Sequence, residues 1–298
     1  MISFTPSNSN SEKVENAPLV NEFSEFTIGS LLLRMGKITP EDAERIMRLH
    51  KEKGLRFGEA AQALGLITED DIQQVLSRQF NYPYLSPDQN SYLNELVAAY
   101  QPFSNKAEVL RAVRSQLMLH WFSPERKALA VSSVSSSDNA SSFVANLAVV
   151  FAQLGENTLL IDANLRYPRQ HEIYNLSNKR GLSDILAGRA GYDVISKINF
   201  FENLSVLTAG TLPPNPQELV SKPTFGNLIK ELACVYDVIL LDTPELSNYS
   251  DGYAIAFTVG GIVLVARQNH TRVNDLSIAV EQCKNNGTKV IGSILVDL

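Results

Sequence analysis

The sequence has few cysteines, no surplus of basic residues and no long apolar run. Only Cys234 and Cys283 occur among 298 residues, and neither lies in a CxxC pair or a Cys/His cluster. The sequence therefore predicts neither a disulfide framework nor a structural zinc site. The formal net charge of −6 gives no support for a general nucleic-acid binder, which usually carries a basic surplus or a basic face.

Two further absences bear on the compartment. No run approaches the roughly 18 apolar residues that a membrane-spanning helix needs. The first residues, MISFTPSNSNSEKVENAP, lack the basic-then-apolar order of a signal peptide. We expect a cytoplasmic protein that reaches a membrane only through a partner. Hydrophobic residues make up 44% of the chain, enough for a sizeable core and two modest domains.

Shifts in composition along the chain predict four segments. Residues 1–22 are rich in Ser and Asn and are predicted to be a disordered tail. Residues 23–85 are predicted to form a helical domain built from a tandem repeat. Residues 86–104 are rich in Pro, Asn and Tyr and are predicted to be a linker. Residues 105–298 are predicted to form an α/β domain.

The helical domain contains two copies of a 24-residue unit, at 27–50 and 56–79, which align without gaps. Each copy predicts a short helix ended by a glycine, then a second helix that begins after a threonine cap, Thr39 or Thr68. Acidic residues follow each threonine, where they suit the helix dipole. Two copies are too few for a solenoid, so a compact all-α module is predicted. The identical pairs are Gly29/Gly58, Gly36/Gly65, Ile38/Ile67, Thr39/Thr68 and Asp42/Asp71.

This repeat resembles the N-terminal domain of type II secretion and pilus assembly ATPases. In some members of that family two such units, five residues apart, bind cyclic di-GMP, and here the spacer KEKGL is also five residues long. The second copy keeps Arg56 and Gln79 at the family positions, whereas the first has Thr27 and His50. Threonine cannot replace the bidentate contacts of arginine. The alternatives are cyclic di-GMP binding and a docking module in which the repeat serves packing. The resemblance implies these cyclic di-GMP candidates: Gly29, Gly36, Arg56, Gly58, Gly65 and Gln79.

From residue 127 onward, short apolar segments alternate with helical ones. Continuous apolar strands between helices are typical of a parallel sheet that is covered on both faces. The sequence therefore predicts a doubly wound α/β domain with a mostly parallel sheet. Strands are predicted at 127–134, 157–163, 204–210, 237–244, 260–267 and 289–295, and helices at 142–155, 181–188, 224–236 and 275–287.

Ligands of such sheets bind at the carboxyl ends of the strands. Residues 132–142, SSVSSSDNASS, lie between a strand and a helix, as a phosphate-binding loop does. Asp162 and Asp242 each follow a run of apolar residues. A carboxylate in that position commonly orients Mg²⁺ or its water. The alternative for Asp242 is that it caps a following turn.

A predicted helix at 105–122 carries Glu108, Arg111 and Arg114. The spacing E-x-x-R-x-x-R places the three charges along one stripe. Without further information such a stripe is a solvated face with one internal ion pair.

Several motifs together resemble the bacterial tyrosine kinases of exopolysaccharide synthesis, the BY-kinases, and among them the EpsG-type chain-length determinants. LLIDANLR matches that family's LLIDADLR, VILLDTP its Walker B strand, and AGTLPPNPQELVSKPTF its AGxxPPNPxELLxSxxF. The resemblance implies a P-loop sheet of the MinD/BY-kinase type, Mg-ATP as cofactor and tyrosine autophosphorylation. It also implies homo-oligomers assembled through Glu108, Arg111 and Arg114, and an inner-membrane polysaccharide chain-length or export protein as partner.

The phosphate loop departs from the family pattern G-E-G-[KR]-[ST]. Counting back from the shared A-N-L-A segment places Ser137, Asp138, Asn139, Ala140 and Ser141 in those positions. Glycine permits the positive φ angles that aim successive N–H groups at phosphates. Asn139 can hold a left-handed conformation, but Ser137 would cost about 1 kcal/mol or more. Ala140 supplies none of the roughly 1.5 to 3 kcal/mol of a lysine's charged hydrogen bond.

One loss lies outside the loop, because Asn164 replaces the second aspartate of the family's Asp-x-Asp pair. Together these losses should weaken nucleotide binding by roughly two to four orders of magnitude and phosphoryl transfer by more. The sequence thus predicts a pseudokinase that regulates exopolysaccharide chain length or export. One alternative is an active autokinase whose substitute cation is Arg166, Lys127 or a lysine of a neighbouring subunit. Another is a positioning ATPase of the MinD/ParA type.

The candidate site residues fall into three groups. The catalytic candidates are Asp162 and Asp242. The nucleotide-binding candidates are Ser137, Asp138, Asn139, Ala140, Ser141, Ser142 and Arg166. The metal candidates are Ser141, Asp162, Asn164 and Asp242.

Overall fold

The computed structural model describes residues 27–79, 85, 92–135 and 138–297. The chain divides into two units, Met1–Asn81 and Tyr82–Leu298, which are described separately. The tail predicted at 1–22 and the loop residue Ser137 lie outside the described residues. Within the described ranges, no helix combines the length and the apolar character needed to span a bilayer.

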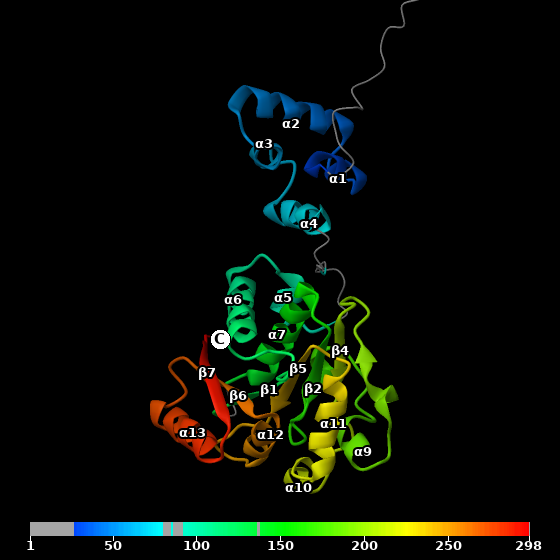
Figure 1. Cartoon of the computed structure of the whole chain (residues 1–298). Coiled ribbons are helices and arrows are strands. Elements are labelled where there is room, and N and C mark those ends of the chain that lie inside the picture. The colour runs from blue at the N-terminus through cyan, green and yellow to red at the C-terminus, as the bar shows by residue number, and fades with distance from the viewer. Residues whose placement is uncertain (1–26, 80–84, 86–91, 136–137, 298) are drawn as a thin grey trace, which may run out of the picture. The chain divides into compact units, whose positions relative to one another are not determined.

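The first unit repeats one pair of helices (Figure 1). Its helices are α1 (Ile28–Arg34), α2 (Pro40–Lys53), α3 (Phe57–Ala63) and α4 (Glu69–Gln79). Both predicted threonine caps are confirmed. The Thr39 hydroxyl accepts from the Asp42 N–H at 3.2 Å, and the Asp42 carboxylate accepts from the Thr39 N–H at 3.1 Å. Thr68 and Asp71 form the same reciprocal pair at 3.2 and 2.9 Å.

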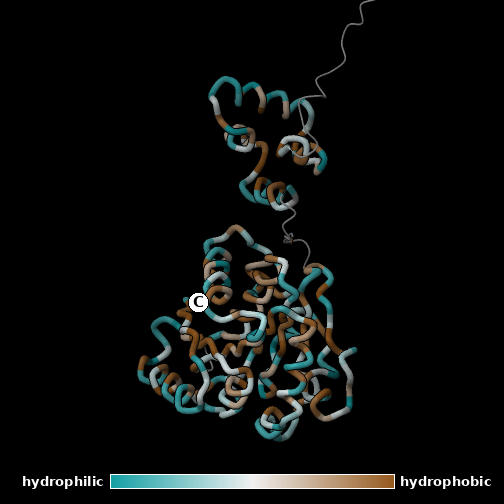
Figure 2. Tube along the Cα trace, in the orientation of Figure 1, coloured by the Kyte–Doolittle hydropathy of each residue, from teal (hydrophilic) through white to brown (hydrophobic). Residues whose placement is uncertain are grey.

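The two copies also share their backbone conformations and their core positions. Gly36 and Gly65 have φ angles of +66° and +67°, the left-handed region that a glycine adopts without strain. Ile38 and Ile67 are both buried in one apolar cluster. Figure 2 shows α2 changing between hydrophilic and hydrophobic along its turns, as expected for a helix with one face on that cluster. The 29-residue repeat of the sequence is therefore a repeat of structure.

The second unit is built on a seven-stranded sheet with the order β3-β4-β2-β5-β1-β6-β7. All neighbouring strands run parallel except β3 and β4, so the predicted mostly parallel α/β sheet is confirmed. The strands are β1 (Ala128–Ser133), β2 (Thr158–Asp162), β3 (Ser196–Lys197), β4 (Leu204–Leu207), β5 (Val238–Thr243), β6 (Gly261–Arg267) and β7 (Lys289–Val296). The antiparallel β3 was not predicted, because two residues carry no periodic signal.

Helices cover both faces of this sheet and create two apolar layers. Along β1, Leu129 and Val131 face one layer, whereas Ala128 and Ala130 face the other. The first layer lies under α5 (Val97–Tyr100), α6 (Asn105–His120), α7 (Ala140–Leu154) and α8 (Gln170–Ile173). The second lies under α9 (Leu182–Leu186), α10 (Pro216–Val220), α11 (Pro223–Ala233), α12 (Asp251–Val259) and α13 (Val273–Asn285). A short 3₁₀ helix, η1 (Tyr192–Val194), precedes β3.

The helix α12 lies where the sequence analysis placed two strands in direct succession. The parallel neighbours β1 and β6 lie beside each other, and α12 packs against β1. A chain that leaves β5 and enters the parallel β6 needs a crossover, and α12 supplies it. The short apolar segment before Gly260 gave too weak a helical pattern to be recognised.

The end of the predicted linker belongs to the second unit. The Leu93 N–H donates to the Ile173 carbonyl at 3.1 Å, and the Ala98 N–H donates to the Asn146 side chain at 2.8 Å. The Asn146 amide in turn donates to the Glu95 carbonyl at 2.7 Å. This segment, residues 92–101, is called the connector below. It lies against α7, the helix that follows the phosphate-loop segment.

Candidate nucleotide-type cavity

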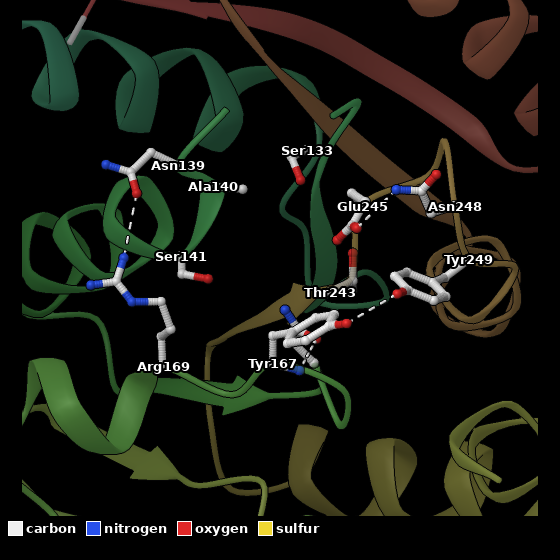
Figure 3. A pocket seen from close by; sticks show the side chains of 11 residues that line it. Ser133, Asn139, Ala140, Ser141, Tyr167, Arg169, Thr243, Glu245, Asn248 and Tyr249 are labelled. Atoms are coloured by element: carbon white, nitrogen blue, oxygen red, sulfur yellow. Dashed lines mark hydrogen bonds between the residues drawn. The ribbon is translucent and has the colours of Figure 1, made fainter. Parts of the chain in front are cut away.

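A cavity of about 450 Å³ lies where the chain leaves β1, β2 and β5. Figure 3 shows its lining from close by. The lining is polar, as expected at the carboxyl ends of parallel strands. The lining residues are Ser133, Asn139, Ala140, Ser141, Asn164, Tyr167, Arg169, Thr243, Glu245, Asn248 and Tyr249.

The loop after β1 brings three of the nucleotide-binding candidates to this cavity. Asn139 has φ 54° and ψ 36°, so the predicted left-handed conformation at this position is confirmed. The side chain of Asn139, the residue before α7, does not cap this helix. The first N–H groups of α7 have no intrahelical acceptor, as at the start of any helix. In Figure 3 the Ser141 hydroxyl and the Ala140 methyl group both point into the cavity.

Asp138 and Ser142 face away from the cavity. Asp138 is fully buried, and its carboxylate accepts from the Ser135 N–H at 2.8 Å and from the Thr271 hydroxyl at 2.7 Å. It therefore ties the loop to the turn after β6. The Ser142 hydroxyl donates to the carboxylate of Glu95 in the connector. Both side chains hold the loop in place rather than line the cavity.

The two candidate catalytic carboxylates are side by side in the sheet. Asp162 and Asp242 are paired in the register of β2 and β5, and both are fully buried. One oxygen of each, Oδ1, has no hydrogen-bond partner among the described residues. Burial and the neighbouring Asp242 raise the pKa of Asp162, and burial raises the pKa of Asp242 to about 6. Two unsatisfied carboxylate oxygens in one buried place attract a cation.

Gln170 bridges the carboxylates and the loop, and sequence reasoning missed it. Its side-chain amide donates to Asp242 Oδ2 at 2.7 Å and to the Ser141 carbonyl at 3.0 Å. The N–H groups of Gln170 and Arg169 both donate to Asp162 Oδ2, at 3.0 and 3.1 Å. Asp162 thus also orders the start of α8. A glutamine in a short helix gives no sequence signal for this role.

The two cations of this chain considered for the missing lysine, Arg166 and Lys127, have different surroundings, and a third cation lines the cavity. The Arg166 guanidinium donates to the buried carboxylate of Asp251 at 2.6 and 3.0 Å and lies 4.2 Å above the Tyr249 ring. Lys127 precedes β1 and donates to the Tyr236 carbonyl at 3.2 Å, at the opposite end of the sheet from the cavity. Arg169, which the sequence analysis did not single out, is the one cationic side chain among the described residues that line the cavity.

Asn164 and two tyrosines form the side of the cavity opposite the loop. The Asn164 side-chain oxygen accepts from the Tyr167 N–H at 3.0 Å, so it shapes the turn after β2. The hydroxyl groups of Tyr167 and Tyr249 are 3.3 Å apart, and Figure 3 shows both rings at the rim. The aromatic rim offers a flat apolar surface beside a polar cavity.

The stripe predicted for oligomerisation makes intrachain contacts in α6. Arg111 donates to Glu108 at 2.7 Å and to the Pro102 carbonyl, and Arg114 donates to the Val150 carbonyl of α7 at 2.8 Å. The Glu108 side chain is 74% exposed and that of Arg111 is 18% exposed. The self-assembly role of the three residues stays a prediction.

The cyclic di-GMP candidates lie in the first unit. Arg56 is exposed and immediately precedes α3, where its N–H donates to Glu59 at 2.8 Å. Gly29 and Gly58 are buried in α1 and α3, and a Cβ at Gly58 would meet Ile72 at 3.2 Å. The Gln79 side-chain oxygen is buried without a partner among the described residues. The cyclic di-GMP assignment stays a prediction.

The two halves of the cavity fit Mg-ATP to different degrees. The unsatisfied oxygens of Asp162 and Asp242 suit a divalent cation. The Gln170 amide links this pair to the loop half, because it donates both to Asp242 and to the Ser141 carbonyl. No group of three His, Cys, Asp or Glu side chains within the described ranges could hold a metal. A cation at these two carboxylates would therefore complete its coordination with water or with oxygens of a bound ligand. The loop half has Ala140 where a triphosphate needs a lysine, so the residues present do not fit a reacting triphosphate.

Comparisons with known proteins point to one family. CapB of Staphylococcus aureus is 36% identical over 205 residues, which are 69% of this chain and 90% of CapB. The tyrosine-protein kinase YwqD of Bacillus subtilis is 32% identical over 200 residues, 67% of this chain and 84% of YwqD. The chain belongs to the bacterial tyrosine kinase family. No family model matches it.

Solved bacterial tyrosine kinase structures share the fold of the second unit. The chimerical protein CapA2B2 is 31% identical with a TM-score of 0.65, covering 77% of this chain and 98% of that one. The kinase domain of Escherichia coli tyrosine kinase ETK is 28% identical with a TM-score of 0.67, covering 70% of this chain and 82% of that one. The resemblance of the second unit to bacterial tyrosine kinases is thereby confirmed. The resemblance of the repeats to secretion ATPases stays a prediction.

Proposed function

We propose that this member of the bacterial tyrosine kinases is a pseudokinase that regulates exopolysaccharide chain length or export. The observation that carries the proposal is the loop half of the cavity. Ala140 lines the cavity at the position of the family's lysine, and Arg169 is held by the carboxylate of Glu95 at 2.7 Å. Phosphoryl transfer depends on positioning and charge neutralisation, so a loop without a free cation supports little of it.

The contacts that hold the loop and α6 in the fold are present, which favours a binding role over a loss of all function. Asp138 still ties the loop to the turn after β6, and Arg114 still joins α6 to α7. Such a chain can still present a kinase-like surface to other subunits. We propose a homo-oligomer and an inner-membrane polysaccharide export protein as its partners, with the tandem-repeat unit docking a partner or binding cyclic di-GMP.

Calorimetry with MgATP and an autophosphorylation assay with labelled ATP test the central part of the proposal. We expect affinity in the millimolar range or weaker and no label on the purified chain. Asp162→Ala serves as the matched control for incorporation that depends on the site. Micromolar binding together with label that Asp162→Ala abolishes would contradict the pseudokinase proposal.

An active autokinase is the second candidate, and one observation favours it. The carboxylate pair that would hold the metal is intact, because Asp162 and Asp242 each keep a buried oxygen without a partner. The same labelling experiment decides between the two candidates. If the chain is active, the label should lie on tyrosine.

Cyclic di-GMP binding has its own test in the first unit. Arg56→Ala should abolish binding in a calorimetric titration if the second repeat holds the ligand, since arginine supplies a bidentate contact. Arg45→Ala is a suitable control, because Arg45 is an arginine of the same unit whose guanidinium pairs with Asp42 at 3.3 Å. No heat of binding from the unaltered chain would leave docking as the role of this unit.

A further inference from the structure

Arg169 occupies a position from which a cation can reach the cavity. It lies directly before α8, beside Asp162, to which its own N–H donates at 3.1 Å. Its guanidinium extends toward the loop (Figure 3) and donates to the Asn139 side-chain oxygen at 3.4 Å. The side chain therefore approaches α7 from the segment between β2 and α8, whereas a P-loop lysine would come from the loop itself.

An acidic side chain of the connector holds this guanidinium. One oxygen of Glu95 accepts from Arg169 at 2.7 Å, and the other accepts from the Ser142 hydroxyl. Burial raises the pKa of Glu95, but the hydrogen bonds from Ser142 and Arg169 outweigh it and lower the pKa overall. Glu95 is therefore charged and neutralises Arg169. The position of Glu95 is fixed by the Asn146 amide, which donates to its carbonyl at 2.7 Å.

We propose that Arg169 is the phosphate-binding cation of this cavity, and that Glu95 competes with a bound polyphosphate for it. This inference rests on the proposed function, because it names the residue that would still bind phosphate at a loop without its lysine. The polyphosphate would lie between the Arg169 guanidinium, the first turn of α7, which Asn139 does not cap, and the Ser141 hydroxyl. A charged guanidinium binds phosphate oxygens in a bidentate manner, and the N–H groups of α7 favour the same charge.

The chemistry of the cavity favours a polyphosphate over a single small anion. The volume of about 450 Å³ is larger than one phosphate needs, and the tyrosine rim lies opposite the loop. The acids Asp162, Asp242 and Glu245 lie in or beside the cavity and disfavour a bare anion. A ligand that brings a divalent cation overcomes that repulsion, and a diphosphate chelates Mg²⁺. Free pyrophosphate and the diphosphate end of a nucleotide share this chemistry.

The Glu95 contact also gives the connector control over the cavity. The connector lies on α7 through Asn146 and on α8 through the Ile173 carbonyl. A displacement of this segment would remove Glu95 and leave the Arg169 guanidinium available to a ligand. Binding of polyphosphate and displacement of Glu95 should therefore favour each other.

Calorimetric titration of the full chain with magnesium pyrophosphate and with MgADP tests the proposal. Arg169→Gln should weaken binding of both ligands about tenfold or more, since a charged hydrogen bond to phosphate is lost. Arg169→Lys should restore part of the affinity. Glu95→Gln should tighten binding roughly two- to fivefold, the range of a partly exposed ion pair. Binding of MgADP but not of pyrophosphate would identify a nucleotide as the source of the diphosphate.

Two control variants separate the specific contact from general electrostatics. Arg180→Gln removes an exposed arginine that lies 3.5 Å from Asp193, and it should leave both affinities unchanged. Glu172→Gln removes an exposed acid that lies 3.9 Å from Arg169, and it should change them less than twofold. Thermal melting verifies that each variant folds.

The outcomes distinguish this inference from the proposed function. Equal affinities of Arg169→Gln and Arg180→Gln, or no measurable diphosphate binding by any variant, would overturn the role of Arg169. Neither result would affect the pseudokinase proposal. Transfer of labelled phosphate by the unaltered chain would overturn the pseudokinase proposal, while the ratio of affinities would still decide the role of Arg169.

Discussion

The cavity of the second unit has two halves that differ in how much of a kinase site they retain. At β2 and β5, Asp162 and Asp242 lie side by side and each keeps an oxygen without a hydrogen bond. At the start of α7, Ala140 lines the cavity where the family has a lysine, and Asn139 replaces a glycine. The difference teaches that the carboxylate pair of such a site and the left-handed conformation at residue 139 can be present without the lysine of the loop.

Restoring the loop half should have the largest effect. The triple substitution Ser137→Gly, Asn139→Gly and Ala140→Lys returns the two glycines and the lysine of the family pattern. We expect MgATP to bind roughly two to three orders of magnitude more tightly, from about 1 kcal/mol of relieved strain and about 1.5 to 3 kcal/mol of one charged hydrogen bond. Calorimetry measures the change.

The matched control for this experiment is the triple variant with Ala140→Met, which has a long side chain without charge. It should regain only the part of the affinity that the two glycines supply. If both triple variants bind MgATP as weakly as the unaltered chain, the loop half does not limit the affinity, and the comparison of the two halves is wrong.

Removing a charge from the carboxylate half should have a smaller effect, on stability. Burial raises the pKa of Asp242 to about 6, above the 3.8 of a carboxyl in the unfolded chain. The unfolded state therefore loses its proton first as the pH rises, and stability falls between about pH 4 and pH 6. Asp242→Asn should raise the free energy of unfolding at pH 7.5 by on the order of 2 kcal/mol and leave it nearly unchanged at pH 4. Denaturant unfolding at the two pH values measures this.

Magnesium chloride sharpens the same test. If the carboxylate half holds a divalent cation, millimolar Mg²⁺ should stabilise the unaltered chain and have less effect on Asp242→Asn. If Asp242→Asn and the unaltered chain have equal free energies of unfolding at both pH values, the ionised Asp242 does not lower the stability of the folded state.

The smallest effect is expected at Asn139, where the backbone is left-handed with φ 54°. Asn139→Ala should lower the free energy of unfolding by about 1 kcal/mol, because alanine tolerates this region less well than asparagine. Asn139→Gly should stay within a few tenths of the unaltered value, since glycine adopts the angle freely but adds entropy to the unfolded chain. Thermal unfolding of the pair measures the difference. Equal stability of Asn139→Ala and Asn139→Gly would show that the loop relaxes out of this conformation.

Much of the fold could be predicted from the sequence, because its signals are local. The apolar runs gave six of the strands, and the threonine and glycine pairs gave both copies of the helical repeat. The elements that were missed are short or weakly patterned, as α12 and β3 are. The crossover rule would have required a helix between β5 and β6 had their parallel pairing with β1 been known.

The candidate site was predictable only in part. Alignment with the family motifs was enough to locate Asp162, Asp242 and the altered loop, because all three lie in those motifs. Gln170 and Arg169 follow the motif LLIDANLR by a few positions, and nothing in their spacing distinguishes them from other residues of a surface loop. Glu95 lies about 45 residues before the loop that it contacts, in a segment whose composition is that of a linker.

By itself, the sequence determined the parallel sheet, the helical repeat and the loss of the loop lysine, because hydrophobic periodicity, capping residues and a missing charge are properties of short segments. The tertiary structure alone decided which cation faces the cavity and which acid neutralises it. The sequence gives the same charge for Arg166, Lys127 and Arg169. The partner of each depends on strands and helices that are distant in the chain.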